Sequence, residues 1–247
     1  MEIIDAFCGI GPWQKRDRLL PWKPEDILNL MDHFGIARAL THANFTSGGG
    51  NALHGNALLA EQAAKEPRFM PVFAITPYPH ADEPAIPDFL DAMRAAGSRA
   101  VWFMPQAHLP VREMYGELLE TCVARRLPVL LNRDTTTPAD VATFLRDWPG
   151  LRLVLAGCSY MEDQWLYPLL KRHGELRLCV GQYYIPADSP HRFLREFPAE
   201  RLVFGSGLPF FSPGGLLANL FYADISDAER EAILGGNIRT LLEEAKP

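Results

Sequence analysis

The sequence has little cysteine for its length. Its 247 residues include four cysteines, which lie far apart in apolar surroundings: Cys8, Cys122, Cys158 and Cys179. A disulfide-stabilised domain crowds its cysteines into a much shorter chain. The spacing therefore excludes a disulfide scaffold, and we expect four reduced thiols that fill the core.

Basic runs and long apolar runs are missing too. The formal net charge is -6, and the charged residues of both signs are interspersed, so no stretch offers the dense positive charge that grips nucleic acid or an anionic lipid surface. No apolar run approaches the roughly 18 residues of a membrane span, and the opening "MEIIDAFCGIG" has no basic region or cleavage site of a secretory signal. We expect a cytoplasmic protein whose partners include neither nucleic acid nor a membrane.

Sequence signatures of phosphate and metal sites are also absent. The glycine-rich stretch at 47–51 does not have the GxxxxGK[ST] pattern, nor does it continue as GxGxxG after a strand, and no two histidines are spaced as HxH or HxxxH. These patterns cradle phosphates or bring two imidazoles to one ion. We interpret the glycine-rich stretch as a lid-like loop.

What the sequence does contain is a regular alternation of short apolar runs with helical patterns. Near-continuous runs of Val, Ile, Leu and Phe are typical of strands buried on both faces of a parallel sheet. Eight such strands are predicted, at 2–7, 38–43, 70–76, 99–105, 128–132, 151–157, 176–182 and 201–207.

Segments with helical periodicity lie between these strands. They span 24–35, 56–66, 86–97, 112–126, 138–150, 163–174 and 190–198, with a final pair at 227–236 and 237–245. Pro24 is suited to a helix start, and Gly35, Gly97 and Gly174 to helix ends. Eight strand-helix repeats favour an α/β fold of the (β/α)8 TIM-barrel type, as a single domain over 1–247. An open doubly wound sheet is the alternative, because alternation does not say whether the sheet closes.

Five motifs at the predicted strand ends and near the C-terminus carry a resemblance to a known family. "IIDAFCGIG" resembles the pattern IDxHxHxG, "PVLLN" resembles PVxxH, "LRLVLAGCS" resembles LxLVLAHxG, "RLVFGSGLPF" resembles RLLFGSDxPF, and "ILGGNIRTLL" resembles ILxxNAxRLL. In this order they resemble the amidohydrolase-related (amidohydrolase 2) branch of the amidohydrolase superfamily. The resemblance implies a barrel related to metal-dependent hydrolases and decarboxylases.

The positions that bind metal in that family carry other residues here. Aligned with the family patterns, the ligand positions fall on Phe7, Gly9, Asn132, Gly157 and Gly207. A zinc-type catalytic ion needs about three imidazole, thiolate or carboxylate ligands and an open position for water. The resemblance therefore implies a divergent member without the family's metal centre, and we expect no cofactor.

Other candidates come from the strand ends and the loops that follow them, because these build the functional face of such a barrel. As catalytic candidates we take His42 as a general base, Arg133 as a clamp for a carboxylate or phosphate, and Cys8 as a thiolate. The alternative roles are a structural histidine, an ion pair with Asp134 on the rim, and an inert buried thiol. The candidate binding residues are Asn132, Asp134, Tyr183, Tyr184, Ser206 and Gln106.

Three functions remain open at this point. The first is a barrel that binds a small molecule, or a non-hydrolytic paralogue. The second is a metal-independent hydrolase or decarboxylase acting on a small carboxylate, lactone or ester at the barrel mouth. The third is a structural subunit, for which a homodimer would be the commonest closed assembly.

Overall fold

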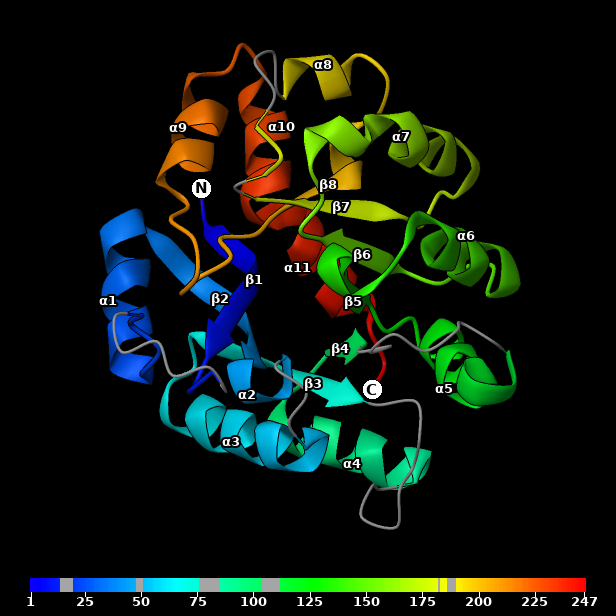
Figure 1. The fold of residues 1–247 in the computed structure, drawn as a ribbon. Helices are drawn as coiled ribbons and strands as arrows, with labels where there is room; N and C mark the ends of the chain where they lie inside the picture. The colour runs from blue at the N-terminus through cyan, green and yellow to red at the C-terminus, as the bar shows by residue number, and fades with distance from the viewer. Residues whose placement is uncertain (14–19, 48–50, 76–84, 104–111, 182, 186–189) are drawn as a thin grey trace.

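Eight parallel strands form the centre of the molecule (Figure 1). The structure is a computed structural model that describes residues 1–13, 20–47, 51–75, 85–103, 112–181, 183–185 and 190–247. The strands are β1 (Ile3–Ile10), β2 (Ile36–Ala43), β3 (Phe69–Ile75), β4 (Ala100–Phe103), β5 (Val129–Asn132), β6 (Leu153–Ala156), β7 (Arg177–Val180) and β8 (Leu202–Phe204). They pair in the order of the sequence, so each prediction of a strand is confirmed.

The last strand returns to the first. Just beyond β8, the Gly207 N–H donates a hydrogen bond of 2.9 Å to the Phe7 carbonyl, and the Gly9 N–H donates one of 2.7 Å to the Leu208 carbonyl. These bonds close the ring of strands and rule out the open doubly wound sheet. The fold is a (β/α)8 TIM barrel, as the sequence predicts.

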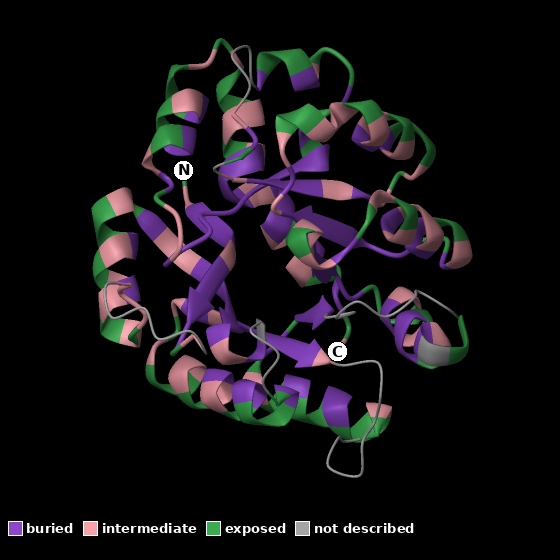
Figure 2. Ribbon diagram, viewed as in Figure 1, coloured by how far each residue is buried: buried purple, intermediate pink, exposed green. Residues whose placement is uncertain are grey.

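Helices surround the barrel, with exposed residues along their outer faces (Figure 2). They are α1 (Pro24–Phe34), α2 (Asn44–Ser47), α3 (Ala52–Lys65), α4 (Ile86–Ala96), α5 (Arg112–Ala124), α6 (Pro138–Asp147), α7 (Asp163–Arg172), α8 (His191–Leu194), α9 (Gly214–Tyr222), α10 (Asp227–Glu231) and α11 (Asn237–Glu244). Short 3-10 turns cover Arg133–Thr135, Tyr160–Glu162 and Ala199–Arg201, and a π-helical turn at Ala232–Gly236 joins α10 to α11.

The predicted helix ends are correct at two of three glycines. Gly35 and Gly97 end α1 and α4 in the left-handed conformation, with φ of 68° and 71°. Gly174 does not end α7: that helix ends two residues earlier, at Arg172, and the His173 N–H that follows donates a hydrogen bond to the Leu169 carbonyl. Helix α9 was not predicted, because "GGLLANLFY" begins with two glycines and has no clear polar face.

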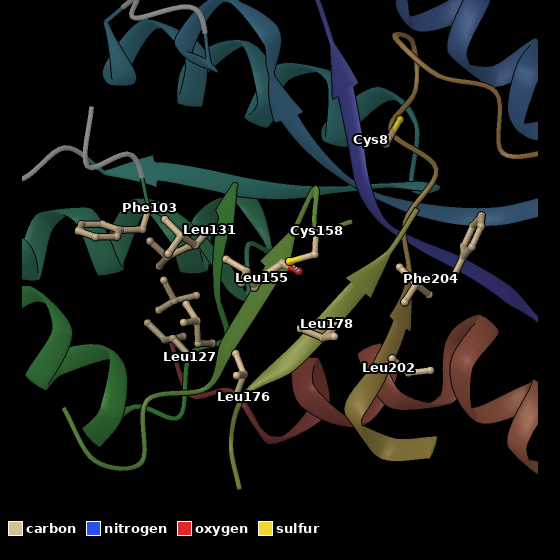
Figure 3. Packing of buried hydrophobic residues seen from close by; sticks show 14 of the residues in the cluster. Cys8, Phe103, Leu127, Leu131, Leu155, Cys158, Leu176, Leu178, Leu202 and Phe204 are labelled. Carbon is tan, nitrogen blue, oxygen red and sulfur yellow. Dashed lines mark hydrogen bonds between the residues drawn. The ribbon is translucent and has the colours of Figure 1, made fainter. Parts of the chain in front are cut away.

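Side chains alternate between two apolar layers along each strand. On β4, Val101 and Phe103 join an outer cluster beneath the helices, while Ala100 and Trp102 join an inner cluster within the barrel. Figure 3 shows part of the outer cluster along β5 to β8. This alternation is what fills the interior of a small barrel with side chains rather than leaving a pore.

Helix α11 closes one end of the barrel. Its Ile238 and Leu241 are buried in the inner cluster with Ile4 and Val203, and Figure 1 shows the helix in the middle of the ring of strands in that view. The open end is therefore the opposite one, where the strands terminate. Across the described residues, every helix is too short or too polar to traverse a bilayer.

Candidate functional site

A cavity of about 640 Å³ opens at the carboxyl ends of the strands, and we call it the mouth pocket. Residues from β1, β2, β4, β5 and the loops after β6, β7 and β8 contribute to it. Its lining consists of Phe7, Trp13, Leu20, His42, Trp102, Asn132, Asp134, Thr135, Gly157, Cys158, Cys179, Gly181, Tyr183, Gly205, Ser206, Gly207, Leu208, Phe210 and Phe211. This is the face on which TIM-barrel enzymes carry their active sites.

Three stacked rings line the pocket beside the inner cluster. The ring of His42 lies 4.3 Å from that of Trp102 and 5.0 Å from that of Phe7, and the Phe7 and Trp102 rings lie 5.2 Å apart, with all planes within 22° of parallel. A bulge in β1 between Asp5 and Cys8 adds one residue relative to β2, and Phe7 joins the inner side of the barrel beyond it. A bulge re-aims the side chains that follow it.

Burial keeps the His42 imidazole neutral. Its side chain is 6% exposed, and burial lowers its pKa to about 3. A neutral imidazole can accept a proton, but with so low a pKa it is a weak base near neutral pH. The predicted role of His42 as a general base stays a prediction, although the structure does place the residue in the pocket.

Two further ring pairs form the walls. Trp13, after β1, meets Phe210 edge to face at 5.1 Å, and Tyr183, after β7, meets Phe211 at the same distance. Edge-to-face pairs of this kind are favourable beyond their buried area. The pocket is thus bounded by aromatic rings from both ends of the chain.

A buried carboxylate supports the pocket from below. Asp5 Oδ1 accepts hydrogen bonds from the Phe7 N–H at 2.9 Å and the Ser206 N–H at 2.8 Å, and Asp5 Oδ2 accepts one from Ser206 Oγ. Ser206 Oγ in turn accepts from the Leu208 N–H at 2.9 Å. Burial raises the pKa of Asp5 to about 6, against the opposing effect of these hydrogen bonds. Ser206 therefore lines the pocket, and its hydroxyl is engaged with Asp5.

At three of the positions that the sequence resemblance assigns to metal ligands, the glycines leave little space for a side chain. A β-carbon on Gly9 would collide with Oδ1 of Asn44, one on Gly157 would lie 2.8 Å from Asn132 Oδ1, and one on Gly207 would lie 2.7 Å from the Phe211 ring. The φ angles of Gly157 and Gly207 are 75° and 72°, in the left-handed region that glycine favours. The backbone and the neighbouring side chains have adapted to glycine.

The side chains at the five positions do not fit a catalytic divalent ion. Among Phe7, Gly9, Asn132, Gly157 and Gly207, only Asn132 carries a donor atom, and its Oδ1 accepts the Asp134 N–H at 3.0 Å. Within the described residues, no three His, Cys, Asp or Glu side chains are grouped so as to hold a metal ion. Catalytic zinc takes about three such ligands.

The thiols near the pocket are protonated. Cys158 and Cys179 line it, and burial raises the pKa of each. Burial also raises the pKa of the Cys8 thiol well above its usual value. Cys8 packs in the outer cluster and does not line the pocket. Figure 3 shows its side chain at a distance from that of Cys158. The structure does not bring Cys8 and His42 together in the pocket.

Arg133 and Asp134 separate at the end of β5. The Arg133 Nε donates to Glu162 at 2.7 Å, its Nη1 donates to the Thr136 carbonyl at 2.6 Å, and its guanidinium lies 5.6 Å from the Trp165 ring centre. Arg133 is not a lining residue, whereas Asp134 is. The rim ion pair considered for Arg133 therefore exists with Glu162 as its partner, not with Asp134.

The two neighbouring tyrosines also separate. Tyr183 lines the pocket and is 45% exposed, whereas Tyr184 is buried in the outer cluster and donates its hydroxyl to Asp163 at 2.8 Å. Gln106 lies outside the described residues. Of the predicted binding residues, the pocket gathers Asn132, Asp134, Tyr183 and Ser206.

Several pocket residues were missed from the sequence. Trp102 lies inside a fully apolar strand, where nothing distinguishes an inward from an outward position. Phe210 and Phe211 follow the strand β8 pattern and had no polar atom to mark them. Trp13 precedes the first helix. The available signal for all four was an aromatic residue within or soon after an apolar strand, and many core residues share that signal.

Comparison with known proteins supports the fold and the family. The model of the amidohydrolase family matches residues 15–243. An uncharacterised TIM-barrel protein from Bordetella bronchiseptica has a similar structure, with a TM-score of 0.75, 19% identity and 99% of each chain covered. No curated protein sequence matches the chain.

Two decarboxylases share the fold as well. Dihydroxybenzoic acid decarboxylase from Polaromonas sp. JS666, solved with manganese and the inhibitor 2-nitroresorcinol, has a TM-score of 0.72 at 16% identity, with 98% of this chain and 97% of that one covered. 5-Carboxyvanillate decarboxylase from Sphingomonas paucimobilis has a TM-score of 0.74 at 13% identity, with 98% and 99% covered. At such low identities, these structural comparisons concern the fold alone. The match to the family model, in contrast, spans nearly every strand of the closed barrel, and the chain therefore belongs to the amidohydrolase family.

Proposed function

We propose that the mouth pocket binds a small aromatic molecule, and that it does so without the divalent ion of the metal-dependent members of the family. The observation that carries the proposal is the lining itself: six aromatic side chains and a neutral imidazole surround a cavity of about 640 Å³. Small-molecule sites are concave and mostly apolar, with a few placed polar groups. Asn132, Asp134 and Ser206 are such groups here.

The metal-free part of the proposal rests on the adaptation of the backbone. A histidine at Gly157 or an aspartate at Gly207 would need a left-handed conformation and would displace Asn132 or Phe211. The backbone and the neighbouring side chains therefore fit the glycines at these positions, and the site differs from a metal site in shape as well as in its lack of ligand side chains. This supports a settled role that uses the new shape.

The class of ligand agrees with what a structurally similar protein holds. The Polaromonas decarboxylase was solved with 2-nitroresorcinol, a single substituted benzene ring. A ring of this size is suited to stacking on and between aromatic side chains, which favour offset and edge-to-face contacts. In this chain Tyr183 and Phe211 on one wall and Trp13 and Phe210 on another provide such contacts.

Metal analysis tests the first half of the proposal. We expect protein purified without chelators, then dialysed against manganese or zinc and desalted, to retain well under one ion per chain by plasma mass spectrometry. One tightly held ion per chain, released when Asn132 is changed to Ala but not when the exposed Glu243 is, would overturn it.

Ligand titration tests the second half. Soluble benzene derivatives should quench the fluorescence of Trp13 and Trp102, which line the pocket. Tyr183→Ala should weaken binding about three- to tenfold, because an aromatic contact is lost. Tyr222→Ala is the matched control, since Tyr222 is 91% exposed on α9 and does not line the pocket. If no member of the panel binds, or if both variants weaken binding equally, the proposed site is wrong.

A metal-independent decarboxylase or hydrolase is the second candidate, and the decarboxylases of similar fold favour it. In this chain the imidazole of His42 and the carboxylate of Asp134, which both line the pocket, are able to accept a proton. Incubation with hydroxybenzoates, esters and lactones would reveal product. Turnover that disappears in His42→Gln, while the ligand still binds, would favour this candidate over binding alone.

A further inference from the structure

The described residues that line the mouth pocket carry one negative charge and no positive charge. Asp134 is the one Asp, Glu, Lys or Arg among the described lining residues, and its side chain makes no ion pair with any residue that the structure describes. Its backbone N–H is held by Asn132 Oδ1, so the residue has a fixed place at the start of the turn Arg133–Thr135. At the edge of the cavity this carboxylate has no cationic partner among the residues that the structure describes.

The adjacent arginine does not neutralise this carboxylate. Arg133 is engaged by Glu162, by the Thr136 carbonyl and by the ring of Trp165, and it does not line the pocket. The His42 imidazole lining the pocket is neutral, so it offers no positive charge. The described lining therefore has a negative charge with no matching cation.

The aromatic rings of the pocket also favour a positively charged ligand. An aromatic face carries partial negative charge and attracts a cation placed over it, most strongly for Trp and more so when the pair is shielded from water. Trp13, Trp102, Tyr183 and Phe211 all border the cavity in which Asp134 stands. Ring faces attract organic ammonium groups, and a carboxylate that lines the same cavity adds a charge of opposite sign.

We propose that the mouth pocket selects a cationic ligand: a small organic ammonium ion attached to an aromatic ring, with Asp134 as its counter-ion. This inference rests on the proposed function, because it assumes that the pocket binds a ring. The ring occupies the aromatic part of the cavity, and the ammonium group lies toward Asp134.

Three ligands that share one ring and differ in charge test the proposal: benzylammonium, benzyl alcohol and benzoate. Calorimetric titration at low ionic strength and neutral pH should rank their affinities in that order, with benzylammonium at least about fivefold tighter than benzyl alcohol. The difference should shrink as salt is added, because Asp134 is exposed to solvent and its charge is screened.

Asp134→Asn should lower the ratio of the affinities for benzylammonium and benzyl alcohol about fivefold. Glu117→Gln on α5 is the matched control: it changes the net charge equally, is exposed and lies outside the pocket, and it should leave the ratio as it is. Equal far-ultraviolet circular dichroism of both variants shows that each is folded.

The outcomes separate the two proposals. If none of the three ligands binds and none competes with another aromatic ligand, the proposed function itself fails. If benzyl alcohol or benzoate binds as tightly as benzylammonium, or if Asp134→Asn leaves the ratio unchanged, the pocket remains and the cation preference is overturned. A ratio that falls equally in Glu117→Gln would assign the preference to overall charge and also overturn it.

Discussion

At the scale of single residues, Gly207 shows how far the barrel mouth has adapted. Its φ of 72° lies in the left-handed region, where a residue with a β-carbon costs about 1–2 kcal/mol, and the β-carbon would also press on the Phe211 ring. We expect Gly207→Ala to lower the free energy of unfolding by about 2 kcal/mol, measured by urea denaturation.

A helical glycine provides the opposite control. Gly116 lies within α5, and a β-carbon there would meet only Arg112 at an ordinary contact distance of 3.5 Å. Gly116→Ala should therefore raise the free energy of unfolding by about 0.5–1 kcal/mol, as a gain in helix propensity. If Gly207→Ala and Gly116→Ala changed the free energy of unfolding by the same amount and in the same direction, our account of Gly207 would be wrong.

His42 should make the protein sensitive to mild acid. Its pKa is about 3 when folded and about 6.5, the usual value for a histidine, when unfolded. Its contribution to stability is therefore complete above pH 6.5 and is lost as the pH falls toward 3. Each unit below 6.5 costs about 1.4 kcal/mol. At pH 5 the wild type should have lost about 2 kcal/mol that His42→Gln does not lose. Parallel stability curves for the two proteins between pH 7.5 and pH 5 would show that the imidazole is not held neutral.

At the scale of elements, α11 closes the end of the barrel opposite the mouth pocket. Its Leu241 is 2% exposed and packs in the inner cluster. Leu241→Ala should lower the free energy of unfolding by about 2–5 kcal/mol, because it leaves a cavity that the closed ring of strands cannot collapse to fill. Glu243→Ala, exposed on the same helix, should change it by under about 0.5 kcal/mol. If urea denaturation showed a lower free energy of unfolding for Glu243→Ala but not for Leu241→Ala, this role of α11 would be contradicted.

The elements themselves were largely predictable, because local chemistry determines them. Pro24 and Gly35 bound α1 as expected, and each apolar run forms its strand. Helix α9 was missed since its two initial glycines resemble a turn, and Gly174 was misread because α7 already ends at Arg172. The first error concerns a whole helix, whose buried Leu216, Leu217 and Leu220 show that packing outweighs its low local propensity. The second concerns only the position of a helix end.

The site was predictable only where strand ends determine it. The ends of β1, β5 and β8 could be located from the sequence, so Phe7, Asn132 and Gly207 were placed correctly at the mouth. Arg133 was not, because its partner Glu162 belongs to the next strand's loop. Tyr183 and Tyr184 are adjacent in the sequence and equivalent in chemistry, so only the path of the chain decides which one faces the pocket.

At the scale of the whole molecule, Asp5 joins the first strand to the last. The pKa of its carboxyl group is about 6 when folded, because burial raises it from the usual 3.8. A raised pKa in a carboxyl group means that its contribution is most favourable below pH 3.8 and is lost as the pH rises through 6. The shift of about two units corresponds to about 3 kcal/mol.

We therefore compare Asp5→Asn with the wild type across this range by urea denaturation. The stability of the wild type relative to the variant should fall by about 2.4 kcal/mol between pH 4 and pH 7, because part of the full change is already lost at pH 4, above the pKa of 3.8 in the unfolded chain. Ser206→Ala, which removes one of the hydrogen bonds to this carboxylate, should raise the folded pKa further, so that the fall continues to higher pH. A constant difference between the two proteins would mean that Asp5 is not desolvated.

The hydrogen bonds of Asp5 to Ser206 span 201 residues of sequence, and this has a consequence for synthesis on the ribosome. The first strand leaves the ribosome long before its partner in the closed ring exists. At about 5–20 residues per second, the Asp5 carboxylate waits about 10–40 s for Ser206. Until then, the side of β1 that faces β8 is an unpaired strand edge, and such edges favour aggregation during synthesis.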